Sequence, residues 1–189
     1  MSGCLGQKAY KLRYREGFEW LLPVDDRDFE QLRFDGRPRA ASWTPVKMKR
    51  LIVSEQGRPL KPGDFFACSG GDMLVFSNRA KEILGADLAR YGEVLPLSCA
   101  GGHFWTLNVT SFLDALDESA SQVVRASDTG GILMIRLHVL KAAAVVGADL
   151  FKLPQTPRGL IYATDSFGEK LKRHNLSGLE LVQVWAPNR

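Results

Sequence analysis

The segment Met73-Leu-Val-Phe-Ser-Asn-Arg-Ala-Lys-Glu-Ile-Leu84 combines the signals of a strand, a helix cap and an amphipathic helix. Its first four residues are continuously apolar, as in a buried strand. Ser77 follows where the hydroxyl of an N-cap residue accepts a free backbone N–H. Apolar side chains then recur at helical spacing, at Ala80, Ile83, Leu84, Leu88 and Tyr91. We expect Gly92 to end this helix.

Strands are predicted on both sides of this unit. Residues 65–68 pair with residues 73–76 in a hairpin, because the Gly-Gly pair between them supplies the positive φ angles of a tight turn. Residues 93–97 and 104–109 form a second hairpin around a glycine-containing turn. Pro96 marks the first of these as an edge strand or as a strand with a break.

The C-terminal part repeats the plan once. A strand at 160–163 leads through a cap at Thr164 or Asp165 into a helix that carries Phe167, Leu171 and Leu176, and the chain closes with an alternating strand at 179–185. Two such units do not make a solenoid, which needs about three stacked repeats. They are two strand–helix–strand solutions to the same packing problem.

Two other segments complete the assignment. Residues 132–138 (Ile-Leu-Met-Ile-Arg-Leu-His) are apolar almost throughout and predict a central, buried strand. Residues 110–116 predict a short helical turn. The sequence therefore indicates an α+β fold, with a mixed, largely antiparallel sheet, two principal amphipathic helices and an N-terminal third rich in strands and loops.

The Pro/Gly-rich connector 54–63 gives the best internal boundary. We expect residues 1–63 to be a basic strand and loop region packed on the same domain as residues 64–189. The whole chain of 189 residues, 45% hydrophobic, has the size of a single globular domain.

A cytoplasmic location is expected. No apolar run approaches the roughly 18 residues of a membrane span, and the N-terminus lacks the apolar segment of a signal peptide. Cys4, Cys68 and Cys99 are an odd, widely spaced set and a poor disulfide framework. Cys68 and Cys99 adjoin apolar runs, so we interpret them as small buried hydrophobes.

The positive charge is concentrated at the start of the chain. Residues 1–63 carry 13 Lys and Arg against 8 Asp and Glu, and the remainder carries 12 against 13, within a net charge of +4. Lys47, Lys49 and Arg50 lie near the aromatic Trp43, and basic and aromatic residues together hold single-stranded nucleic acid. A nucleic-acid-binding module is therefore the alternative function. A solvated basic face explains the same residues.

Signals for catalysis are weak. His103, His138 and His174 show no zinc-ligand spacing, and no phosphate-binding glycine motif occurs. Cys99 and His103 are close in sequence, but a catalytic dyad depends on geometry in space. We expect no enzyme activity, no cofactor and no metal; an enzyme would instead be inactivated by Cys99→Ala or Asp117→Asn.

Asp114, Asp117 and Glu118 form the one dense acidic cluster. Paired carboxylates can hold a hard cation or transfer protons, but acidic residues around turns more often cap and solvate them. An exposed acidic loop can also pair with Lys and Arg across an interface. We regard these three residues, together with Trp43, Lys47, Lys49 and Arg50, as candidate partner-binding residues.

Several segments, taken in order, resemble a bacterial immunity-protein family, the eleventh in the numbered immunity series, a former domain of unknown function known from myxobacteria. They are residues 72–77, 93–97, 104–109, 113–119 with Ser121, 147–153, 161–167 and 176–181. The resemblance covers roughly the last two-thirds of the chain. The sequence departs from the family pattern at Thr164-Asp165, where Ser-Asp is commoner, and at Gly168.

The resemblance implies a protein that binds and neutralises a cognate polymorphic toxin, usually encoded by an adjacent gene. It implies no catalysis and no cofactor, and the matching positions are scaffold, so no toxin contact is carried over. At +4 the chain is not a global phosphate mimic. The acidic loop is a local mimic if the toxin is a nuclease; otherwise the toxin is acidic or is blocked by shape.

Overall fold

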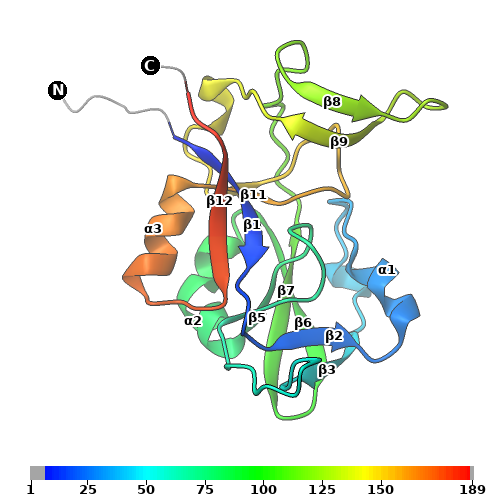
Figure 1. Ribbon diagram of the computed structural model, residues 1–189, viewed down its shortest axis with the longest axis vertical. Coiled ribbons are helices and arrows are strands. Elements are labelled where there is room, and N and C mark those ends of the chain that lie inside the picture. Colours follow the sequence, from blue (N-terminus) through cyan, green and yellow to red (C-terminus); the bar gives the residue numbers. More distant parts are fainter. Residues whose placement is uncertain (1–6, 188–189) are drawn as a thin grey trace.

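The computed structural model describes residues 7–187 and confirms the α+β fold (Figure 1). The strands form sheets of six, four and two members. Two principal helices, α2 (Asn78–Leu88) and α3 (Asp165–Arg173), pack into one core that joins the two larger sheets. Cys4 lies outside the described residues.

The six-stranded sheet curls until its end strands meet. Its order is β2-β3-β6-β7-β5-β4, with bounds Trp20–Pro23 (β2), Lys47–Leu51 (β3), Gly92–Cys99 (β6), Gly102–Val109 (β7), Val75–Ser77 (β5) and Phe65–Phe66 (β4). The Leu21 N–H donates to the Ala67 carbonyl beyond β4 at 2.9 Å. Because side chains alternate along a strand, one set points inward: Leu21, Met48, Phe66, Val75, Leu95, Leu97 and Phe104.

The four-stranded sheet has the order β10-β11-β1-β12, with bounds Leu150–Phe151 (β10), Tyr162–Thr164 (β11), Ala9–Tyr14 (β1) and Leu179–Trp185 (β12). Strand β1 is antiparallel to both of its neighbours. In the same way, β7 separates β5 from β6 in the larger sheet. Each of the two strand–helix–strand units therefore has an antiparallel strand inserted between its parallel strands.

The two helices begin differently. Ser77 caps α2 as predicted, since its Oγ accepts the Ala80 N–H at 3.1 Å. Thr164 occupies the N-cap position of α3, but its hydroxyl donates to the Ala148 carbonyl at 2.6 Å. The Asp165 carboxylate accepts the Tyr10 hydroxyl at 2.6 Å. The start of α3 is thereby tied to the N-terminal strand.

The N-terminal third is interleaved with the rest of the chain. Strand β1 lies between the C-terminal strands β11 and β12, and β3 pairs with β6 in parallel. Between β2 and β3 lie helix α1 (Phe29–Leu32) and the 3₁₀ turns Asp26–Asp28 and Ala40–Ser42. Leu32 and Phe34 fill the space inside the curled sheet. Residues 7–63 and 64–187 therefore share both larger sheets.

Several local predictions are wrong. Gly70 and Gly71 do not have positive φ; a Cβ at Gly71 would instead strike the Leu12 carbonyl, so close backbone approach is what requires glycine there. Gly92 begins β6 rather than capping α2, which ends at Leu88. Residues 110–116 are extended, not helical, because they bridge to Lys152 and Leu140.

The prediction that residues 132–138 form a central, buried strand is also wrong. Residues 132–137 form β9 (Ile132–Leu137), but within residues 7–187 β9 pairs only with β8 (Gln122–Arg125), in the two-stranded sheet. This hairpin stands off the rest of the molecule at the top of Figure 1. A continuous apolar run predicts burial, and here much of the run is exposed to solvent.

A further 3₁₀ turn at Ala142–Val145 follows the hairpin. None of the helices within residues 7–187 has the length and apolar character needed to cross a membrane.

Candidate partner-binding surface

The β8–β9 hairpin exposes large apolar side chains. Leu133, Met134 and Leu137 are 69%, 56% and 48% exposed. Ile132 and Ile135 are half-buried and pack against the core beneath β11. An isolated two-stranded hairpin is marginally stable in water, so this inner contact and the base of the hairpin hold it in place.

The base of the hairpin is fixed by polar contacts. The Ser121 hydroxyl accepts the Val139 N–H at 2.9 Å. His138 is buried, and its Nε2 lies 2.9 Å from the Tyr162 hydroxyl. Burial, aided by the nearby Lys11 charge, lowers the pKa of His138, so the ring is neutral at physiological pH. These contacts join the hairpin to β11 of the four-stranded sheet.

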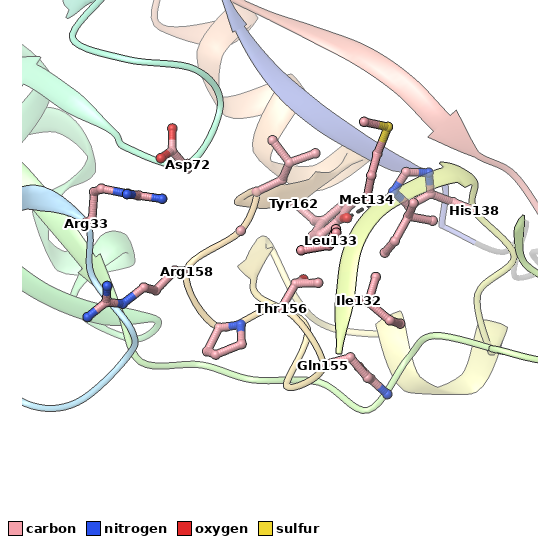
Figure 2. Close-up of a pocket in the computed structure, with 14 residues that line it drawn as sticks. Arg33, Asp72, Ile132, Leu133, Met134, His138, Gln155, Thr156, Arg158 and Tyr162 are labelled. Carbon is pink, nitrogen blue, oxygen red and sulfur yellow. Dashed lines mark hydrogen bonds between the residues drawn. The ribbon is translucent and has the colours of Figure 1, made fainter. Parts of the chain in front are cut away.

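A cleft of about 670 Å³ runs beside β9. One wall is formed by residues 132–135 of β9, and the other by the loop 155–160. Figure 2 shows the apolar side chains of β9 on one side and Arg33, Asp72 and Arg158 at the far side. Concave apolar sites with a few polar groups are typical of binding sites.

The charged end of the cleft is largely compensated within the chain. Arg33 lies 3.1 Å from Glu30, and Arg158 lies 3.6 Å from the same carboxylate. Exposed ion pairs of this kind contribute about 0–1 kcal/mol. The apolar wall on β9 is therefore the feature that sets this surface apart.

Lys152 lies buried under the loop wall, and sequence reasoning did not identify it. Its Nζ donates to the Phe34 carbonyl at 2.8 Å and to the Pro157 carbonyl at 3.1 Å. Burial lowers its pKa to about 8, against an opposing pull from Asp72 and Asp35. The only sequence signal is a lysine inside the apolar run of residues 150–153. Lys152 thus ties the loop beside the cleft to the N-terminal third.

The four basic and aromatic candidate residues do not form one surface. Lys47 and Lys49 are both exposed on β3, at the lower end of the view in Figure 1. Arg50 turns to the other side and binds buried Glu19 at 2.6 Å. Trp43 is half-buried and donates its indole N–H to the Pro96 carbonyl at 2.8 Å. Arg50 and Trp43 are thus engaged within the chain.

The acidic candidates lie on the loop that precedes β8. Asp114 pairs with Lys141 at 2.9 Å, and Glu118 pairs with Arg125. Asp117 closes its own turn by accepting two backbone N–H groups and the Ser119 hydroxyl. Hydrogen bonds, with Lys141 beside Asp114, hold the pKa of Asp114 and Asp117 below the usual range. The structure does not bring these residues near Lys47 and Lys49.

Within the described residues, neither cysteine has the environment of an activated nucleophile. Cys99 lies at the end of β6, and burial raises the pKa of its thiol, which opposes formation of a nucleophilic thiolate. Burial raises the pKa of Cys68 to about 12. Within residues 7–187 no group of three or more His, Cys, Asp or Glu side chains is placed to hold a metal ion.

A small α+β protein with an exposed apolar hairpin and an open cleft has the features of a protein that acts through a partner. Comparison of the sequence with known protein families defines the class of protein. The sequence model described as "Immunity protein family (Imm11)" matches residues 19–185. Since this match spans most of the chain, the protein belongs to that immunity protein family. The match also includes most of the N-terminal third, beyond the part where the sequence resemblance was evident. A search of curated proteins finds no match.

Proposed function

We propose that this protein neutralises a toxin by binding it stoichiometrically, without catalysis, and that the β8–β9 hairpin and its cleft are the surface that the toxin covers. The observation that carries the proposal is the exposure of Leu133, Met134 and Leu137 in a member of an immunity protein family. Large exposed apolar patches mark protein interaction sites. The toxin is encoded by an adjacent gene, and the complex forms in the cytoplasm.

The hairpin can supply useful binding energy. Full burial of a Leu or Met side chain contributes about 1.5–3 kcal/mol. Between about half and two-thirds of each of the three side chains is still exposed, so a partner that covers all three gains about 3–5 kcal/mol. That gain corresponds to about 100- to 4000-fold in affinity. The hairpin is thus a main contributor rather than the whole interface.

The placement of the acidic loop favours an apolar contact over phosphate mimicry. Asp114 and Glu118 are already paired with Lys141 and Arg125. A cation-binding toxin surface would have to displace these partners before using the carboxylates. The hairpin side chains need no such rearrangement.

Co-expression tests this function. The adjacent gene is expressed in a bacterium alone, with this protein, and with a Leu133→Ser/Met134→Ser variant. We expect growth arrest alone, rescue by the wild type and weaker rescue by the variant. The matched control is Ile52→Ser, which changes another exposed apolar residue, 53% exposed, at a distance from the hairpin.

The outcomes separate the two parts of the proposal. Absence of rescue by the wild type against a toxic neighbour would refute toxin neutralisation. Equal rescue by the wild type and the hairpin variant would refute the hairpin surface while leaving the function intact. A soluble, folded variant, checked by its thermal melting curve, excludes misfolding as the reason for lost rescue.

A further inference from the structure

The outer face of β2 and β3 is a second exposed surface with its own chemistry. Because side chains alternate, one face of this pair points into the curled sheet and the other points to solvent. Trp20 stands opposite Leu51, and Leu22 stands opposite Lys49. The Val24 N–H donates to the Lys47 carbonyl, which continues the row. We call these six residues the β2–β3 outer face.

This face is apolar and hollowed at one end. Trp20 is 45% exposed and Leu51 39%. A hollow of about 360 Å³ lies between them and the neighbouring loop, lined by apolar Leu22, Val53 and Leu60 and by residues 54–56. Helices α2 and α3 pack in the core cluster that contains Phe76, Leu107 and Leu150. Neither of these two helices contributes a residue to the core cluster of β2 and β3.

Unpaired cations lie beside the apolar row. Within residues 7–187 neither Lys47 nor Lys49 is in an ion pair, whereas Arg50 of the same strand is bound to Glu19. Arg58 and Lys61 are also exposed, on a segment held against this region by the Leu60 N–H to Ile52 carbonyl hydrogen bond. The opposing charge at the hollow is Glu55. The region is therefore basic around an apolar centre.

We infer that the β2–β3 outer face binds an acidic segment of a partner polypeptide that also carries apolar side chains. The acidic groups meet Lys47 and Lys49, and an apolar side chain enters the hollow beside Trp20. This inference concerns a surface separate from the hairpin and does not depend on the toxin proposal.

Two other occupants fit less well. Single-stranded nucleic acid is held by rows of stacking aromatic rings in a basic groove, whereas this face has a single aromatic residue among aliphatic ones. A second copy related by a two-fold axis would present the same patch. Lys47 and Lys49 of the two copies would then face a surface of like charge, which opposes association.

The test uses the full-length protein and a fluorescent random copolymer of glutamate and tyrosine, with poly-glutamate and single-stranded DNA as comparison ligands. We expect the copolymer to bind more tightly than poly-glutamate and DNA. Lys47→Glu/Lys49→Glu should weaken copolymer binding by about 10-fold or more. Trp20→Ala/Leu51→Ala should weaken it by a similar factor and remove the advantage over poly-glutamate.

The matched control is Lys172→Glu/Arg173→Glu, which reverses two exposed charges on α3. An equal loss in this control would show unspecific attraction and overturn the inference. Tighter binding of DNA with the same dependence on Lys47 and Lys49 would assign the face to nucleic acid. A dimer that dissociates on Trp20→Ala/Leu51→Ala would assign it to a second copy. The hairpin variant should bind the copolymer as the wild type does.

Discussion

Lys152 makes the stability of this protein depend on pH in an unusual direction. Its ammonium is buried and donates to the Phe34 and Pro157 carbonyls, and burial lowers its pKa from 10.5 to about 8. In the unfolded chain the lysine returns to its ordinary value. Between these two values the unfolded state binds more protons than the folded state, so stability rises with pH.

The magnitude follows from the two pKa values. Between about pH 7.5 and about pH 10, Lys152 should add about 2 kcal/mol to the free energy of unfolding. Lys152→Met removes this titration while retaining the buried side-chain volume. We therefore expect the unfolding free energy of the wild type, minus that of the variant, to rise by that amount over this pH range.

Urea denaturation at a series of pH values measures this difference. Taking a difference matters because other groups, such as the Cys68 thiol with its pKa raised to about 12, titrate in the opposite sense. Lys172→Met, at an exposed position on α3, is the control and should show no such trend. A Lys152→Met difference that stays constant from about pH 7.5 to about pH 10 would refute the reasoning.

Three other perturbations test the scaffold by chemical denaturation. Asp64→Ala should lower the free energy of unfolding by about 3 kcal/mol, because this buried carboxylate accepts two hydrogen bonds from Ser177 and pairs with Arg79. A loss below about 1 kcal/mol would contradict this. Gly178→Ala should be at least as damaging, because φ is +90° and the new Cβ would strike the Phe65 carbonyl; near-wild-type stability would show that the loop relaxes. Burial of Glu93 is outweighed by hydrogen bonds to its carboxylate, which lower its pKa from 4.5. Glu93→Gln should therefore lower the free energy of unfolding at neutral pH, and the difference from the wild type should become smaller in acid. A difference that does not depend on pH would argue against this.

Local chemistry made much of the fold predictable. The Ser77 cap, helix α2, the β6–β7 hairpin and strand β12 all follow from caps, apolar spacing and turn residues close together in sequence. The pairing of strands that are distant in sequence was not predictable. Ala9 pairs with Thr164 across most of the chain, and no local pattern states which distant strand will be the partner.

Burial was the other source of error. Residues 132–137 have the composition of a central strand, and composition cannot distinguish a strand buried by its own chain from one that a partner covers. A conflict between local pattern and observed exposure is expected at functional sites. Lys152 was missed for a related reason, since its partners are backbone carbonyls that carry no sequence signature.

Among the predicted contact residues, Lys47 and Lys49 lie on one exposed face of β3, the face for which a second binding surface is proposed. Arg50, Trp43 and the acidic loop have partners within the chain that spacing could not reveal.

Toxin binding is tested most directly by mixing the purified protein with the product of the adjacent gene and measuring the mass and affinity of the complex. We predict a stable one-to-one complex in which toxin activity is lost, and an affinity weakened by about 30-fold or more in the Leu133→Ser/Met134→Ser variant. A toxin that remains active and unbound at equal concentration would contradict the account.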